Sequence, residues 1–424
     1  MKKIIVLLSL SFFSTSYAQD WFEVASGTSN DLNVIDFPSN LVGYIGGTDS
    51  LLLKTIDGGK TWEKIAYSGV TFVESGGYDD DIINLKFINN EIGYMTVGPY
   101  SNGVFKTIDG GLNWILVSPM EDDLCYNYGL YFFAEDDGFL GGSDCFTGEQ
   151  IHRVDLSGTY PASIIDLPLS VATVADIDFY DLNYGLAVGG YASGGSILKT
   201  EDGGSTWTGI PTEFGPSFIL NEVVIVNDTL AYIAYENDDD TYGLLESTDM
   251  GESWHYHGET TTFYYPKFRA IHKAGNGQVF TAGSTEIEPH GVIFGSMLTE
   301  VWWNYWSLDQ PIESISSYND SIVWAVGDSG YIVVNVNPES LTIPSIEEAP
   351  FDFTIYPNPA RDYFQLTGIN QEDVSSIMIH NCLGAVLYEG NDFHINSNDM
   401  SEGIYLVTVY LNSGQQLTKK LIKG

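Results

Sequence analysis

Thr55-Ile56-Asp57-Gly58-Gly59-Lys60-Thr61-Trp62 is the stretch that decides the fold, because its pattern returns three more times in this chain of 424 residues. The pattern, here called the box, is Ser or Thr, Asp, Gly and Trp at the first, third, fifth and eighth positions. Its fixed residues are Thr55, Asp57, Gly59, Trp62, Thr107, Asp109, Gly111, Trp114, Thr200, Asp202, Gly204, Trp207, Ser247, Asp249, Gly251 and Trp254. Repetition at spacings near multiples of about 45 residues predicts a repeat architecture.

A second pattern precedes each box and also occurs where no box follows. It is an alternating apolar segment, a polar turn and an aromatic-rich segment that usually ends in Gly, which is typical of paired β-strands. Seven copies lie at 34–47, 85–98, 130–142, 177–190, 223–235, 270–283 and 315–327. Each continues into a third strand, and the box leads into a fourth strand that opens on its Trp. Small four-stranded sheets bury both faces by radial stacking, so the sequence predicts an all-β, seven-bladed β-propeller.

The two ends of this region explain how the ring would close. The third strand of the seventh unit, at 330–336, runs into a segment rich in proline. Residues 21–24, Trp-Phe-Glu-Val, have the character of a fourth strand that opens on Trp. We therefore expect residues 21–24 to complete the seventh sheet.

The box resembles the Asp-box, or BNR, repeat of sialidases and related propellers. Its Gly-Gly-x-x-Trp segments are also similar to those of photosynthesis-system assembly-factor propellers, which act in protein interaction. In such a turn the Asp can accept backbone N–H bonds, the Gly can adopt positive φ and the Trp can fill the space between sheets. We expect a structural role, because a catalytic group would not recur on several blades, and we assign no catalytic residue.

A glycoside hydrolase is the alternative function. The sialidase family needs three arginines for the substrate carboxylate, whereas this propeller region holds only Arg153 and Arg269, so that chemistry is excluded. Xyloglucanase-type enzymes also carry the boxes and use a pair of carboxylates in a cleft between two propellers. Asp79 and Asp176 are the candidate carboxylates here, but a single propeller supplies no such cleft.

One face of the propeller should carry the longer loops. In a four-strand meander the second-to-third and fourth-to-first connections share a face, here called the loop face; the boxes lie on the opposite, box face. Tyr and Asp gather on the loop face, at 78–81, 122–126 and 238–242, as on surfaces that bind glycans, proteins or Ca²⁺. Candidate Ca²⁺ ligands, none with EF-hand spacing, are Asp79, Asp80, Asp81, Asp238, Asp239 and Asp240. No other cofactor is indicated, and a merely solvated rim is the competing interpretation.

The chain has three cysteines. Cys125 and Cys145 flank one predicted hairpin almost symmetrically, which places them across paired strands and within disulfide reach. Cys382 is left over and reads as a small buried hydrophobe. His255 and His257 share one face of a predicted strand, but without a third ligand nearby they make a poor metal site.

The N-terminus and the net charge constrain the setting. Lys2 and Lys3, an apolar run over 4–13 and a small-residue site at 16–18 predict a secretory signal peptide over 1–18. No later apolar run is long enough to span a bilayer. A net charge of −41 makes nucleic acid and anionic lipid poor partners.

Residues 337–350 contain three prolines and read as a linker, and the strand pattern that follows fits a small β-sandwich over 351–424. Its signature residues are Tyr356, Pro357, Asn358, Pro359, the turn 381–384, Gly403, Tyr405, Lys419 and Lys420. Together they resemble the type A C-terminal sorting domain of the type IX (Por) secretion system. The resemblance implies recognition by that machinery and transport across the outer membrane.

The sequence therefore predicts a signal peptide (1–18), a propeller (19–336), a linker (337–350) and a sorting domain (351–424). We expect a non-enzymatic protein, secreted by or held on the surface of a Gram-negative bacterium. Its acidic loop face would bind a glycan or a protein.

Overall fold

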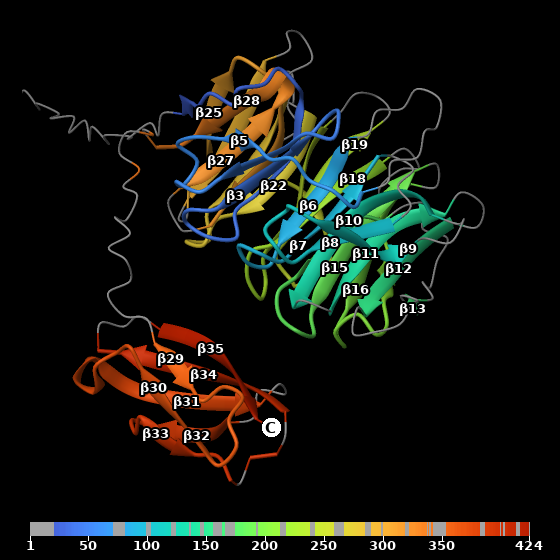
Figure 1. The fold of residues 1–424 in the computed structure, drawn as a ribbon. Helices are drawn as coiled ribbons and strands as arrows, with labels where there is room; N and C mark the ends of the chain where they lie inside the picture. The colour runs from blue at the N-terminus through green and yellow to red at the C-terminus, as the bar shows by residue number, and fades with distance from the viewer. Residues whose placement is uncertain are drawn as a thin grey trace, which may run out of the picture. The chain divides into compact units, whose positions relative to one another are not determined.

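A computed structural model describes most of the chain after the N-terminal segment (Figure 1). The described residues are 21–70, 81–98, 103–119, 124–134, 137–144, 148–155, 163–165, 174–191, 194–212, 218–237, 242–257, 267–284, 290–297, 300–318, 322–336, 338, 341, 353–381, 386–398, 400–401, 403–412 and 416–423. The chain divides into two compact units, 1–341 and 342–424, and each is described by itself. The described part contains no helix with the length and hydropathy of a membrane span.

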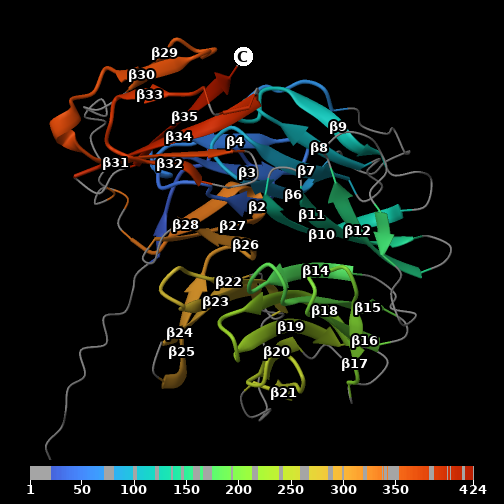
Figure 2. The same ribbon diagram turned by 90° about the horizontal axis from the view of Figure 1, so that it is seen from below.

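The described residues of the first unit form seven four-stranded antiparallel sheets (Figures 1 and 2). Their strands are β2 (Leu32–Asp36), β3 (Gly43–Gly47), β4 (Leu52–Thr55), β5 (Glu63–Lys64); β6 (Ile82–Phe87), β7 (Gly93–Val97), β8 (Gly103–Thr107), β9 (Trp114–Pro119); β10 (Leu124–Ala134), β11 (Asp137–Asp144), β12 (Gly148–Asp155), β13 (Ser163–Ile165); β14 (Val174–Phe179), β15 (Gly185–Tyr191), β16 (Gly194–Thr200), β17 (Thr208–Ile210); β18 (Phe218–Ile225), β19 (Ala231–Asn237), β20 (Tyr242–Ser247), β21 (His255–Tyr256); β22 (Lys267–Lys273), β23 (Val279–Ser284), β24 (Gly291–Met297), β25 (Glu300–Leu308); and β26 (Ile312–Ser317), β27 (Val323–Gly327), β28 (Tyr331–Val334), β1 (Phe22–Glu23).

The first strands of consecutive sheets, here called the axial strands, contact one another around a closed ring. They are β2, β6, β10, β14, β18, β22 and β26, and β26 contacts β2 again. Seven small sheets around one axis are a β-propeller, so the predicted fold class is confirmed.

The predicted closure is also confirmed. Strand β1 pairs with β28, with Phe22 opposite Val334 and Glu23 opposite Val333, and Val24 N–H donates to Ile332 O at 2.9 Å. The last sheet therefore takes its outer strand from the N-terminal end of the propeller. This pairing ties the two ends of the ring together.

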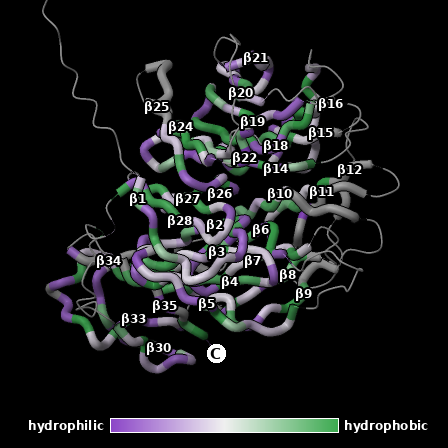
Figure 3. The backbone as a smooth tube through the Cα atoms, turned by 90° about the horizontal axis from the view of Figure 1, so that it is seen from above, coloured by the Kyte–Doolittle hydropathy of each residue, from purple (hydrophilic) through white to green (hydrophobic). Residues whose placement is uncertain are grey.

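Each sheet is buried on both faces by its neighbours, which explains the apolar second strands. All residues of β3, β7 and β27 are buried. In Figure 3 the tube is mostly hydrophobic along strands such as β15 and β18. The core is a series of clusters between sheets, such as the one that joins Phe37 and Trp62 to Trp324.

Six axial strands carry a register shift near their start, after one to three paired residues. The shifts lie between Leu32 and Val34, Ile82 and Asn84, Val174 and Asp176, Leu220 and Glu222, Phe268 and Ala270, and Ile312 and Ser314. A β-bulge bends and twists a strand. Repeated at one level, it lets the axial strands turn together at the loop-face end of the axis.

The second unit is a small β-sandwich, as predicted. One sheet has the order β29 (Thr354–Tyr356), β30 (Tyr363–Thr367), β33 (His394–Asn396), and the other β32 (Val386–Gly390), β31 (Val374–Asn381), β34 (Gly403–Leu411), β35 (Gln416–Lys423). Between them lies an apolar core of its own that includes the fully buried Phe353, Phe364 and Val407.

Candidate functional site on the loop face

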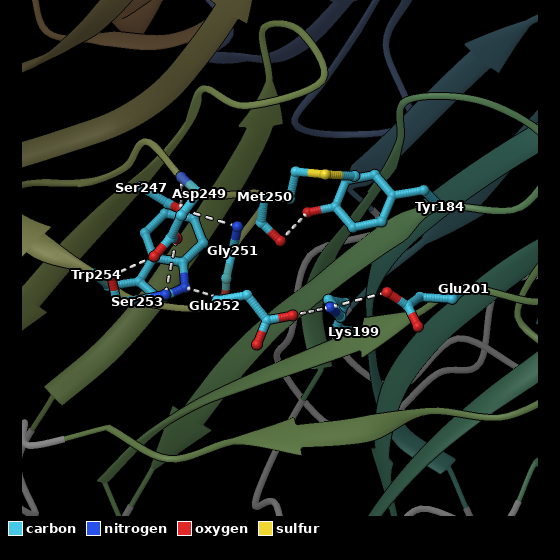
Figure 4. A network of polar contacts seen from close by, with 10 residues as sticks. All are labelled: Tyr184, Lys199, Glu201, Ser247, Asp249, Met250, Gly251, Glu252, Ser253 and Trp254. Carbon is cyan, nitrogen blue, oxygen red and sulfur yellow. Dashed lines mark hydrogen bonds and ion pairs between the residues drawn. The ribbon is translucent and has the colours of Figure 1, made fainter.

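The four boxes form nearly identical closed turns, and Figure 4 shows the one around Asp249. In the first, Thr55 Oγ1 donates to Asp57 Oδ1 at 2.8 Å and accepts Gly59 N–H at 2.9 Å. Asp57 Oδ1 also accepts Thr61 N–H at 3.0 Å. The corresponding bonds recur around Asp109, Asp202 and Asp249. Each box carboxylate is therefore occupied by its own turn.

The residue at the seventh position of the box, which the sequence interpretation missed, completes the hydrogen bonding of the carboxylate. The residue before the Trp donates a side-chain hydrogen bond to the second carboxylate oxygen in every box, at 2.6–2.7 Å. The donors are Thr61, Asn113, Thr206 and Ser253. The recurrence of a small polar residue at this position was the available signal.

These bonds set the ionisation of the box carboxylates. Partial burial alone would raise the pKa of Asp57, but hydrogen bonds from Thr61 and Thr55 outweigh it and lower the pKa. For Asp109 the hydrogen bonds from Asn113 are the main cause of a lowered pKa. A carboxylate held ionised by its own turn is suited to structure rather than to proton transfer.

The box also touches the preceding sheet. Tyr184 donates its hydroxyl to Met250 O at 2.6 Å, and Lys199 forms ion pairs with Glu201 and with Glu252 (Figure 4). At Gly59, where φ is +89°, an added Cβ would lie 2.3 Å from Trp324 of the preceding sheet. The box glycine thus lets two sheets approach.

The box tryptophans act mainly by packing. Trp114 Nε1 and Trp254 Nε1 donate to the carbonyls of Gly111 and Gly251, at 3.0 and 3.1 Å. The corresponding nitrogens of Trp62 and Trp207 have no hydrogen-bond partner among the described residues. All four rings lie in apolar clusters between sheets.

A second polar network joins the axial strands. Asp36 Oδ2 accepts Phe87 N–H at 2.7 Å from the next sheet, and Asp176 Oδ2 accepts Val223 N–H at 2.9 Å. The same kind of bond links Asp178 to Ile225, Glu222 to Ile271 and Ser314 to Ile35. An axial strand has no partner strand on its inner edge, and these side chains satisfy its N–H groups.

Three of the axial carboxylates, those of Asp176, Asp178 and Glu222, influence the pKa values of one another. Burial raises the pKa of Asp176 to about 7 and that of Asp178 to about 6. Burial, with the nearby charge of Asp176, also raises the pKa of Glu222 well above its ordinary value. Asp176, the hydrolase candidate, thus caps a neighbouring strand, whereas its proposed companion Asp79 lies outside the described residues.

The loop face carries a different set of carboxylates, here called the acidic seam, where the seventh, first and second sheets meet. Its members are Asp31, Asp49, Asp81, Glu313 and Asp328. Asp31 Oδ1 accepts Ser329 N–H at 2.7 Å, and Asp81 Oδ1 accepts Asp49 N–H at 3.1 Å. These bonds bring loops from three sheets together.

Charge in the seam is poorly balanced. Arg269 Nη1 lies 2.8 Å from Glu313 Oε2. Burial, followed by the negative charge of Asp31, raises the pKa of Asp328, and burial also raises the pKa of Glu313 despite the arginine. Carboxylates that raise the pKa of one another mark a region of negative potential.

An open depression adjoins the seam. It has a volume of about 460 Å³ and is lined by 23–29, which link the closing strand β1 to β2, and by Ser329, Gly330 and Tyr331. Ser329 is also the residue that donates to Asp31. The depression and the acidic seam therefore meet at Ser329.

Several sequence-predicted residues lie outside this description. Asp79, Asp80, Asp238, Asp239, Asp240, Cys145 and Cys382 are outside the described residues, and the structure describes only the backbone of Cys125. Strands β10 and β11 pair Leu124 with Asp144, the residues just before the two cysteines, and the disulfide stays a prediction. His257 contacts Glu246. No group of three or more potential metal ligands occurs among the described residues.

In the second unit, the predicted signature residues come from both ends of the domain. Tyr356 is 67% exposed at the end of β29, while Tyr405 is buried in β34. Lys419 Nζ lies 5.7 Å from the centre of the Phe353 ring. Lys420 lies in the final strand β35.

Comparison with known proteins supports both units. Residues 354–424 match the family model of the secretion system C-terminal sorting domain. No curated protein matches the chain in sequence. Similar solved structures include YCF48 bound to D1 peptide (16% identity, TM-score 0.55, 75% of this chain and 97% of that one covered). They also include YCF48 from Cyanidioschyzon merolae (18%, 0.57, 76% and 99%) and the WD40 β-propeller domain of Doa1 (12%, 0.51, 74% and 96%).

At these identities the solved structures establish the propeller fold, and the family model establishes the role of the second unit. Residues 354–424 are a C-terminal sorting domain, and the chain is a β-propeller protein that the type IX secretion system exports to the cell surface or the extracellular space.

Proposed function

We propose that this exported propeller is a non-enzymatic binding protein whose loop face takes a cationic segment of a protein. The observation that carries the proposal is the acidic seam, in which Arg269 pairs with Glu313, one of five carboxylates, beside an open depression of about 460 Å³. An acidic, concave surface attracts cationic ligands and speeds their association.

The box and axial carboxylates are less suited to such a ligand, because they hold the turns and strands of the propeller itself. Box aspartates accept hydrogen bonds from their own turns, and axial carboxylates cap neighbouring strands. A YCF48 structure of the same fold holds a peptide, which supports a protein ligand over a glycan without identifying it.

The test compares the wild-type chain with two variants that lose the same charge. Asp31→Asn, Asp81→Asn and Asp328→Asn together remove three charges from the seam and keep an acceptor oxygen at each position. Glu63→Gln, Glu91→Gln and Asp228→Asn remove three charges from exposed positions away from the loop face.

Each protein is applied to arrays of Lys/Arg-rich and neutral peptides, to a glycan array and to a polysaccharide hydrolysis screen. We expect wild type and control to bind a subset of the cationic peptides, more weakly at higher salt, and the seam variant to bind at least about tenfold more weakly. Binding to glycans that is equal in all three proteins would contradict the proposed site. Turnover of any polysaccharide would replace the binding function with the hydrolase alternative.

A further inference from the structure

Two parts of the sorting domain that are more than 60 residues apart in sequence meet at one sheet edge. Strand β35 pairs with β34 along one edge from Gln416 to Lys423. On its other edge, Ile422 N–H donates to Asn358 Oδ1 at 2.8 Å, and Ala360 N–H donates to Ile422 O at 2.7 Å. Both backbone groups of Ile422 that point away from β34 are therefore bonded to the Tyr-Pro-Asn-Pro-Ala segment.

The residue types of this segment fit the contact. Pro357 and Pro359 have no N–H to donate, so the segment cannot continue as an ordinary paired strand. The Asn358 side chain supplies the acceptor that the edge N–H needs. Ala360 is fully buried in the core of the sandwich, which anchors the segment behind the contact.

Exposed apolar residues occur at the contact and close to it in sequence. Tyr356 is 67% exposed and Ile422 is 37% exposed. The same strand carries Lys419, Lys420 and Lys423, which together with Arg361 are all the lysines and arginines of 351–424. The contact thus links the segment that bears an exposed aromatic ring to the strand that carries three of the four lysines and arginines of 351–424.

We propose that Asn358 is a positioning residue for export. By holding Ile422 it joins the end of β35 to the segment that follows Tyr356, so that the type IX machinery recognises a folded surface built from both segments rather than a linear tail. This inference concerns the sorting domain and is independent of the proposed propeller ligand.

The test uses the full-length chain in a bacterium with a type IX system, with Asn358→Ala, Asn358→Asp and Asn396→Ala. Asn358→Asp keeps an acceptor oxygen and is the conservative variant. Asn396 is the matched control, because its Oδ1 also accepts a backbone N–H, from Asn398 at 2.8 Å, but it lies in the other sheet. Each variant is measured for the exported fraction against the periplasmic fraction, for the melting temperature of the purified chain and for hydrogen exchange of the Ile422 amide.

For Asn358→Ala we expect export to fall about tenfold, the Ile422 amide to exchange at least about tenfold faster and the melting temperature to match that of Asn396→Ala. Asn358→Asp should restore export to near the wild-type level. Wild-type export of Asn358→Ala, or an equal loss in Asn396→Ala, would overturn the proposal. Loss of export in Asn358→Ala with an unchanged exchange rate of the Ile422 amide would also overturn the proposal. If Asn358→Ala does not accumulate in the cell, the proposal is overturned when Asn358→Asp fails to be exported.

Discussion

At the scale of single residues, the box is a self-contained hydrogen-bonding unit that uses five positions rather than four. Thr61 donates both its N–H and its hydroxyl to Asp57, at 3.0 and 2.6 Å. Asn and Ser serve equally in other boxes, because the carboxylate needs a short donor and not a particular residue. The repeat pattern revealed the carboxylate but not the side chain that completes it.

Removing that donor should cost stability without changing the fold. Thr61→Val keeps the shape of the side chain and deletes the hydroxyl, so we expect a loss of about 1 kcal/mol in the free energy of unfolding. Thr61→Ser keeps the hydroxyl and should stay within about 0.5 kcal/mol of wild type. Equilibrium urea unfolding of the three proteins measures the difference, and equal loss in both variants would show that the methyl group matters instead.

The box glycine should be far less tolerant than a glycine of similar backbone conformation elsewhere. Gly59 and Gly27 have φ values of +89° and +75°, but only at Gly59 does an added Cβ meet another atom, 2.3 Å away on Trp324. Gly27→Ala should cost about 1 kcal/mol, the penalty for positive φ alone. Gly59→Ala should cost at least about 1 kcal/mol more from overpacking. Similar melting temperatures of the two variants would argue against close contact between the first and seventh sheets.

At the scale of strands and sheets, the sequence predicted most of the fold and little of its polar chemistry. Alternation, turns and the four boxes marked the sheets, and the Trp at position 21 marked the closing strand. The bonds between axial strands could not be predicted, because Asp36 and Phe87 are 51 residues apart and belong to different sheets. The period of a repeat reveals which strands exist, but it does not reveal which side chain accepts the free N–H groups along the inner edge of a strand. The same reason hid the contact between Asn358 and Ile422.

The axial carboxylates predict a stability maximum in weak acid. Their raised pKa values, about 7 for Asp176 and about 6 for Asp178, mean that the folded state holds these protons more tightly than the unfolded state. Stability is therefore highest when they are protonated and falls as pH rises toward 7. The box aspartates have lowered pKa values, so their contribution is lost as pH falls below about 4.

We expect the melting temperature of the wild-type chain to be highest at about pH 4 to 5 and lower on both sides. Asp176→Asn keeps an acceptor for Val223 N–H but cannot ionise, so it should flatten the decline between pH 5 and 8. Asp228→Asn, at an exposed position, is the control and should leave the profile unchanged. A profile of Asp176→Asn that overlays the wild type would exclude this carboxylate as a cause.

Closure by β1 makes a further prediction about the ring. A chain that begins at residue 27 lacks Phe22 and Val24, and it leaves β28 as an open edge. We expect its melting temperature to fall by several degrees relative to a chain that begins at residue 19, because an apolar cluster at the closing sheet loses its cover. An unchanged melting temperature would refute the role of this strand.

At the scale of the whole molecule, each of the two units has its own core, and the second unit directs export. The propeller core lies within 24–341 and the sandwich core within 353–421, so each has the apolar interior that an independent domain needs.

Truncation after residue 341 should therefore leave the thermal unfolding transition of the propeller within about 2 °C of that in the full chain. In a bacterium with a type IX system, the truncated chain should accumulate folded in the periplasm, because the region that matches the sorting-domain model is gone. Calorimetry and fractionation measure the two effects separately. Export of the truncated chain would contradict dependence on the second unit, whereas a large fall in the melting temperature would mean that the propeller needs that unit for its own stability.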